Sequence, residues 1–120
     1  MATDIDRIEL EAVPAAVERP GSVEQEVRDQ FARAVALTRS GQLGEAAEVF
    51  EGILEAHPGI LEVHRNLGFI YAQQKDWPNA ETHFLAALEL SPGEPDFVAA
   101  LVKIYEQSGQ EEKAKELVRR

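Results

Sequence analysis

The sequence of 120 residues contains no cysteine and no long apolar run. Without cysteine, disulfide bonds, thiolate nucleophiles and cysteine-ligated metal sites are excluded. A membrane-spanning helix needs about 20 predominantly apolar residues in succession. The amino terminus, MATDIDRIELEAV, is acidic where a secretory signal would be basic. We therefore expect a cytoplasmic protein that does not insert into a membrane.

Basic residues are also scarce in this chain. Lysine and arginine together number 12 against 22 aspartates and glutamates, which gives a formal net charge of -10. Such a charge argues against a nucleic-acid partner, because the phosphate backbone is itself anionic. The composition, 44% hydrophobic and 28% charged, is typical of a globular protein, and the length leaves room for one compact domain or one short repeat array.

The same residue types recur at intervals of 34 positions along the chain. Ala46, Ala80 and Ala114 are spaced in this way. A fixed period of this length is typical of repeated supersecondary units that must stack to bury their apolar faces. The other residues with the same spacing are Leu37, Tyr71 and Tyr105, then Phe50 with Phe84, Leu54 with Leu88, and Pro58 with Pro92.

Each unit is predicted to form two helices joined by a tight polar turn. In the central unit, one apolar stripe at helical spacing precedes the turn residues 74–76 and another follows them. The first stripe consists of Val63, Leu67, Ile70 and Tyr71, and the second of Ala80, Phe84, Ala87 and Leu88. For the whole chain we expect six helices, at about 23–40, 44–57, 61–74, 78–91, 95–108 and 111–119.

Gly68 lies inside the first helix of the central unit, where glycine costs about 1 kcal/mol relative to alanine. Close packing would offset this cost, because a residue without a Cβ lets another element approach. We expect Gly68 and Ala80 to face each other across the turn, so that the two helix backbones lie close together.

Several residues of the central unit stand at fixed offsets within the period: Leu67, Gly68, Tyr71, Ala80, Phe84, Ala87 and Pro92. This pattern resembles that of the tetratricopeptide repeat (TPR) proteins, with His64 in place of the usual tryptophan. The resemblance implies an all-α fold, a right-handed superhelix of antiparallel helix-turn-helix hairpins, or α-solenoid. It covers a three-repeat domain at residues 23–120, with repeats at about 27–60, 61–94 and 95–120.

The first 22 residues differ in composition from the repeats. They contain Pro14, Pro20 and Gly21 and only a faint apolar pattern. We expect residues 1–22 to form a flexible acidic extension. The alternative is that this apolar and acidic segment docks on the repeats, either its own or those of a neighbouring chain.

Residues in a catalytic or metal-binding pattern are not found in the sequence. Its three histidines, His57, His64 and His83, form no HExxH motif or equivalent pairing. No phosphate-binding loop, dinucleotide fingerprint or nucleophile elbow occurs. We therefore predict a protein that is not an enzyme and holds no cofactor or metal, with histidines in structural or surface positions.

The resemblance implies that the first helices of successive hairpins line a concave groove that binds a partner protein. Asn66 stands where family members often hold a bound peptide backbone. We expect an adaptor or scaffold whose groove takes a peptide or helical segment with hydrophobic anchors and some acidic residues. By this resemblance, the partner-binding residues are Arg28, Phe31, Val35, Arg39, Glu62, Arg65, Asn66, Phe69, Gln73, Ala99 and Lys103.

A different assignment is open for three of these residues. Phe31 and Val35 also suit the core of the first helix, where Val23, Val27, Phe31 and Ala34 form a helical stripe. Phe69 lies beside the core stripe of its own helix, so burial within the hairpin explains it less readily.

The alternative function is an assembly module that forms homo-oligomers through its repeat ends or its amino-terminal extension. Leu117 and Val118 lie near a carboxyl-terminal edge with no polar capping helix after it. Repeat ends of this kind tend to expose apolar surface, which favours self-association.

Overall fold

A computed structural model describes residues 23–119, which form six α-helices. The helices are α1 (Val23–Arg39), α2 (Leu43–Ala56), α3 (Leu61–Gln73), α4 (Trp77–Leu90), α5 (Pro95–Gln107) and α6 (Glu111–Arg119). Each end lies within one residue of its predicted position. Residues 1–22, for which an extension was predicted, and Arg120 lie outside the described part of the chain.

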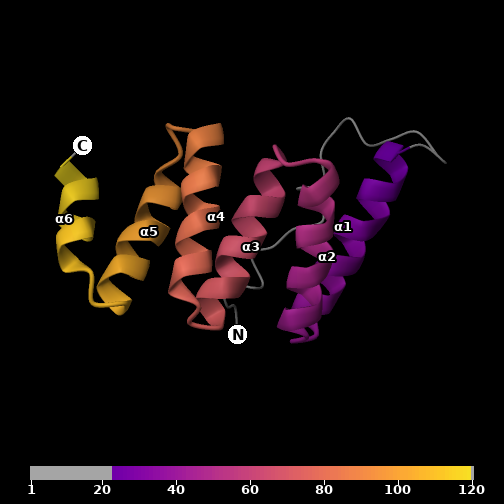
Figure 1. Ribbon diagram of the computed structural model, residues 1–120, viewed down its shortest axis with the longest axis horizontal. Helices are drawn as coiled ribbons and strands as arrows, with labels where there is room; N and C mark the ends of the chain where they lie inside the picture. Colours follow the sequence, from indigo (N-terminus) through magenta and orange to yellow (C-terminus); the bar gives the residue numbers. More distant parts are fainter. Residues whose placement is uncertain (1–22, 120) are drawn as a thin grey trace.

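The helices stack side by side in chain order, from α1 at one end to α6 at the other (Figure 1). Consecutive helices pair as three antiparallel hairpins, α1–α2, α3–α4 and α5–α6. The molecule is elongated, with extents of 48 × 28 × 26 Å. The predicted all-α helical solenoid is confirmed. None of the helices described within residues 23–119 is both long enough and apolar enough to cross a membrane.

The turn inside each hairpin contains one residue in the left-handed region of backbone space. These residues are Gly41 (φ 84°), Lys75 (φ 61°) and Gly109 (φ 77°), and they are 34 positions apart. Glycine adopts this conformation without strain, whereas a residue with a Cβ is strained there by roughly 1 kcal/mol. Lys75 is therefore the strained member of the three turns.

Two helix starts show why the sequence folds locally as it does. The carboxylate of Asp76 caps α4 by accepting a hydrogen bond from the amide of Asn79 at 3.4 Å. Pro78 lies in the first turn of α4 and Pro95 begins α5. Proline is tolerated at these positions because the first amides of a helix have no intrahelical acceptor.

The interior consists of two clusters of buried apolar side chains. The first lies among α1, α2 and α3 and includes Phe31, Phe50 and Leu67. The second lies among α4, α5 and α6, with Phe84 and Leu101 at its centre. Each large apolar side chain buried in this way contributes about 1.5–3 kcal/mol. Successive hairpins are therefore held together mainly by apolar contact across their junctions.

Gly68 lies in a close contact between α3 and α4, though against a different residue from the one predicted. A Cβ atom added there would lie 2.7 Å from Cε2 of Phe84, and two more ring atoms would be within 2.8 Å. The ring of Phe84, one turn beyond Ala80, fills the space because helical side chains point back toward the amino terminus. The glycine is thus required for packing, but by an aromatic ring.

Candidate functional site

A pocket of about 480 Å³ opens between the second and third hairpins. It is lined by residues of α3, α4 and α5 and of the turn between α3 and α4. Its apolar lining, buried or half-buried, comes from Phe69, Ala72, Trp77, Phe84, Ala100 and Ile104, and its exposed lining from Gln73, Lys75, Asp96, Ala99, Lys103 and Gln107.

The charged residues that line this pocket are mostly basic, whereas those of the whole chain are mostly acidic. Lys75 and Lys103 supply two positive charges and Asp96 one negative charge, in a protein whose formal net charge is -10. Apolar walls with exposed ammonium groups beside them suit a ligand that combines an apolar group with a carboxylate.

Four of the predicted partner-binding residues meet in this pocket. They are Phe69 and Gln73 on α3, and Ala99 and Lys103 on α5. Phe69 is half-buried and packs its ring edge-on against Phe84, with the ring centroids 5.1 Å apart. Phe69 therefore belongs to the second apolar cluster as well as to the pocket wall.

Two predicted residues on α1 lie in the interior. Phe31 and Val35 are 0% and 1% exposed and belong to the first apolar cluster. The ring of Phe31 packs edge-on against Phe50 at 5.4 Å. Phe31 and Val35 are thus core residues of α1, as the alternative assignment expects.

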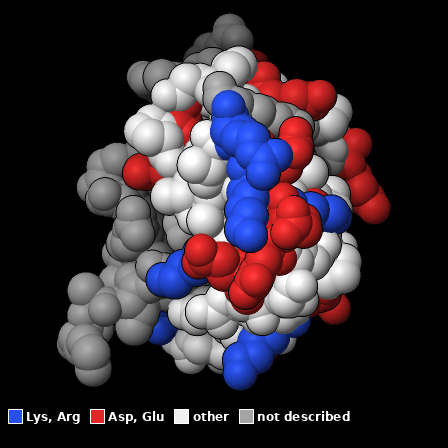
Figure 2. Space-filling model, turned by 90° about the vertical axis from the view of Figure 1, so that its left-hand side faces the viewer, with Lys and Arg blue, Asp and Glu red and all other residues white. Residues whose placement is uncertain are grey.

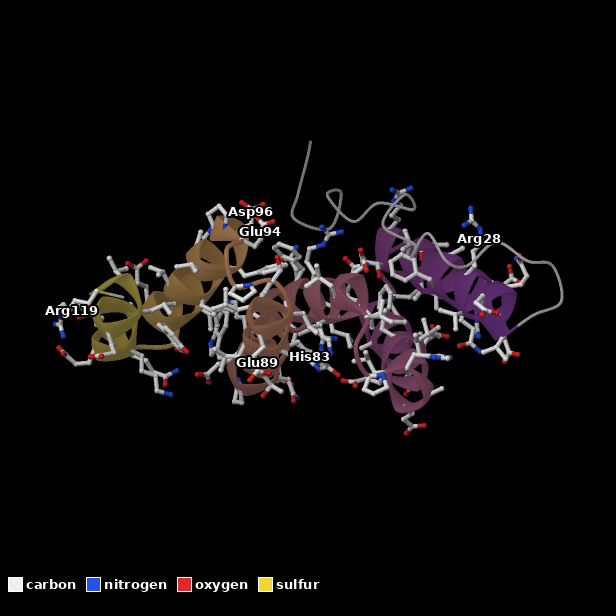
Figure 3. All side chains as sticks on the ribbon, turned by 90° about the horizontal axis from the view of Figure 1, so that it is seen from above. Arg28, His83, Glu89, Glu94, Asp96 and Arg119 are labelled. Atoms are coloured by element: carbon white, nitrogen blue, oxygen red, sulfur yellow. The ribbon has the colours of Figure 1, made fainter. Side chains whose placement is uncertain are left out.

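The remaining predicted residues outside the pocket are polar. Arg28 and Arg39 are exposed on α1, and Glu62 and Arg65 are half-buried on α3. Arg28 and the pocket residue Asp96 lie along one long side of the molecule when it is seen from above, whereas His83 lies along the other (Figure 3). The two sides of the solenoid therefore present different residues.

Asn66 has an unusual environment for a polar residue. Its side chain is 0% exposed, and neither its amide nitrogen nor its amide oxygen has a hydrogen-bond partner. A buried polar group left unpaired costs about 1–3 kcal/mol. Such groups are rare in folded proteins, so the unpaired amide of Asn66 calls for a specific explanation.

Trp77 and Lys75 were not among the predicted site residues. The prediction followed the first helices of the hairpins, whereas Trp77 begins a second helix and Lys75 belongs to a turn. One signal was available, because Trp77 is the only tryptophan of the sequence and stands directly after the turn at the end of α3. Aromatic residues of this kind are enriched in binding sites.

A hydrogen-bonded cluster joins α2, α3 and α4 on the side of the molecule where His83 lies. Nδ1 of His64 is 3.0 Å from Nδ1 of His83, and Nε2 of His83 is 3.2 Å from Oε2 of Glu51. The hydroxyl of Tyr71 donates to the same carboxylate oxygen at 2.8 Å. In the described residues, no group of three or more histidines and carboxylates is arranged to hold a metal ion.

Two pKa values in this cluster are shifted. Burial raises the pKa of Tyr71, and its hydrogen bond to ionised Glu51 raises it further. Burial also lowers the pKa of His83 below its ordinary value, an effect that Glu51 opposes and His64 reinforces. His64 and His83 thus lie where structural histidines would, in a contact between helices.

Two sequence-family models, both described as tetratricopeptide repeat, match the chain at residues 31–95 and 73–120. The first match alone spans more than half of the chain. The chain belongs to the tetratricopeptide repeat family. The repeats of this family are protein-interaction modules and are typically not enzymes, so this TPR protein has a general role in protein interaction.

This TPR chain is similar to part of a longer protein. Cell division cycle protein 27 homolog A of Arabidopsis thaliana is 38% identical over 76 residues, which are 63% of this chain and 10% of that protein. The chain thus spans about a tenth of the length of that relative.

Proposed function

We propose that this TPR protein is a non-enzymatic adaptor that binds a segment of a partner protein along α1, α3 and α5. The pocket between α3 and α5 takes an apolar anchor of that segment. A peptide or a helix is the kind of ligand that a groove between helices receives, through side chains spaced along one face.

The observation that carries this proposal is the pocket itself. Its volume of about 480 Å³ lies in the range of ligand sites, and its lining is apolar at depth and polar at the surface. Lys75 and Lys103 would attract a carboxylate beside the anchor. The favoured ligand is therefore an apolar residue, aromatic or aliphatic, flanked by aspartate or glutamate.

Asn66 supports the same proposal. It lies three residues before Phe69 on α3, so that both residues lie on neighbouring turns of one helix face. A side-chain amide can donate and accept at once, which matches the backbone of an extended peptide. Because the side chain is 0% exposed, a partner segment would pair with this amide only once the side chains that cover it move aside.

The test is site-specific photo-crosslinking in a native lysate. A benzophenone amino acid replaces Ala99, which is exposed at the pocket, and in a matched chain it replaces Glu48, which is exposed on α2. We expect a partner to crosslink from position 99 and not from position 48. Lys103→Glu should abolish the crosslink, because the added carboxylate repels an acidic segment.

Lys115→Glu serves as the charge-matched control, since Lys115 is exposed on α6 away from this pocket. Circular dichroism of each variant verifies that the fold is retained. Equal crosslinking from both positions, or crosslinking that survives Lys103→Glu, would contradict binding at this pocket. Phe69 is not a suitable position for the test, because its ring also packs on Phe84.

Self-association through the α6 end is the second candidate function, and one side chain favours it. Val118 is 68% exposed, whereas Leu117 packs against the second apolar cluster. Acidic and basic side chains are interspersed over this end of the molecule (Figure 2). Light scattering over a concentration series tests it, and a strict monomer at high concentration excludes it.

A further inference from the structure

The cluster around His83 is continued by one more contact, which fixes the positions of its protons. Nε2 of His64 lies 2.9 Å from the carbonyl oxygen of Pro58. A carbonyl only accepts hydrogen bonds, so Nε2 of His64 carries a proton. In a neutral imidazole the other nitrogen then carries none. Nδ1 of His64 is therefore an acceptor, and Nδ1 of His83 donates to it across 3.0 Å.

The remaining contact lacks a proton when both histidines are neutral. A neutral His83 with a proton on Nδ1 has a lone pair on Nε2. That lone pair faces Oε2 of Glu51 at 3.2 Å, and an ionised carboxylate is also only an acceptor. Three contacts thus require three protons, whereas two neutral imidazoles bring two. One further proton on Nε2 of His83 makes all three contacts hydrogen bonds.

We propose that His64, His83 and Glu51 form a site for one shared proton at the junction between the first and second hairpins. His83 becomes an imidazolium that donates to His64 through Nδ1 and to Glu51 through Nε2. Glu51 belongs to α2, in the first hairpin, and both histidines belong to the second. The proton therefore acts between repeats.

The second junction shows the same arrangement with a permanent cation. There the hydroxyl of Tyr105 donates to Oε2 of Glu81 at 2.7 Å, and Nζ of Lys113 lies 3.6 Å from the same oxygen. Lys113 also lies over the ring of Tyr105 at 5.6 Å.

His83 makes a similar contact at the first junction, from α4 as Lys113 does from α6, although the two are not equivalent positions of the repeat. Its ring stacks on Tyr71 with a centroid distance of 5.6 Å, and Tyr71 is the repeat equivalent of Tyr105. Each junction therefore joins a tyrosine, a glutamate and a nitrogen base. Lysine is charged at all physiological pH values, whereas histidine gains its charge only below neutrality. Of these two junctions, the first is the one whose nitrogen base gains its charge only below neutrality.

The groups that face His83 determine the pH range of proton uptake. Burial disfavours the imidazolium most, Glu51 on α2 favours it, and a charge on His64 of α3 disfavours it. Tyr71 on α3 stays neutral, because burial, Glu51 and then Asp76 all raise its pKa. The balance lowers the pKa of His83, so uptake occurs at more acidic pH than in an exposed histidine.

The test uses nitrogen-15 NMR of the histidine rings in the full chain over a pH series. At about pH 8 we expect His64 to carry its proton on Nε2 and His83 on Nδ1, the less common tautomer of a free histidine. On acidification, Nε2 of His83 should gain a proton while the Nδ1–Nδ1 hydrogen bond persists.

Glu51→Gln removes the charge that favours the imidazolium. We expect it to lower the proton affinity of His83 about tenfold or more, a shift of at least one pH unit. Glu81→Gln is the matched control, because it removes the equivalent carboxylate at the second junction. It should leave the titration of His83 unchanged.

Three results would overturn the proposal. The first is a pair of rings that both carry the proton on Nε2 at high pH and titrate independently. The second is an equal shift of His83 in the Glu51→Gln and Glu81→Gln variants. The third is uptake of the proton by Glu51 with His83 remaining neutral, which carbon-13 NMR of the carboxyl group detects.

Discussion

Replacing Gly68 by alanine tests the close packing between α3 and α4. Alanine in the interior of a helix gains about 1 kcal/mol over glycine. Its Cβ would lie 2.7 Å from the ring of Phe84, which is 1% exposed and held between Phe69 at 5.1 Å and Phe97 at 6.4 Å. A ring fixed in this way has little room to shift, and overpacking costs about 1–3 kcal/mol. The net expectation is a destabilisation of zero to about 2 kcal/mol.

Gly52→Ala provides the matched control. Gly52 lies inside α2, and nothing lies within 4 Å of the added Cβ. Alanine there should stabilise the protein by about 1 kcal/mol, because only helix propensity changes. The difference between the two variants therefore isolates the packing cost. Urea denaturation followed by far-ultraviolet circular dichroism measures the free energy of unfolding of each.

Equal stabilisation by Gly68→Ala and Gly52→Ala would refute the reasoning, because it would show that the ring of Phe84 moves without cost. A second background makes the test sharper. In a Phe84→Leu chain the ring is absent, so Gly68→Ala should become less destabilising than in the original chain. Gly68→Leu should be the most damaging change at this position.

Three further predictions concern a turn, a buried amide and the pH dependence of stability. Lys75→Gly should raise the free energy of unfolding by up to about 1 kcal/mol in urea denaturation, because φ is 61° there and glycines occupy the equivalent positions 41 and 109. Asn66→Leu should stabilise the fold by about 1 kcal/mol or more, since it replaces an unpaired buried amide with an apolar group of similar size. It should also weaken partner crosslinking from position 99. A loss of stability would contradict the unpaired state of the amide. The pKa of His83 is lowered from 6.5, so the unfolded chain binds this proton more readily than the folded chain. The free energy of unfolding should therefore be fully retained above pH 6.5 and fall as the pH drops through the lowered pKa, by at most about 1.4 kcal/mol per pH unit for one proton. His83→Gln should reduce this fall.

The helices of this protein could be predicted from the sequence because several independent signals coincide. The period of 34 residues fixes the length of each hairpin, and polar turn residues divide it. Prolines at positions 78 and 95 mark helix starts, where their missing amide proton costs nothing. Each of these signals depends only on neighbours along the chain.

The burial of side chains on α1 could not be predicted in the same way. Arg33 stands at a position that is apolar in the other two repeats, and it is exposed. Phe31, two residues earlier, is fully buried against Phe50. Which residues of a helix turn inward depends on its rotation against its neighbour, and the repeat pattern is weakest in this first unit.

The histidine cluster also could not be predicted from the sequence. His64 and His83 are 19 positions apart, and Glu51 is 32 positions from His83. Their meeting depends on the stacking of one hairpin on another, and no short motif records that geometry. The pocket was partly predictable, because Phe69 and Lys103 follow the first-helix register, whereas Trp77 reaches it from the next helix.

The left-handed conformation of Lys75 has a consequence for attempts to redesign this protein. A repeat-averaged sequence would place glycine at position 75, as at 41 and 109, and would gain stability from it. Such a variant would also lose one of the two ammonium groups that line the pocket. Screening for thermal stability alone would therefore select against the charge that we propose attracts the partner, and a useful screen would score both properties together.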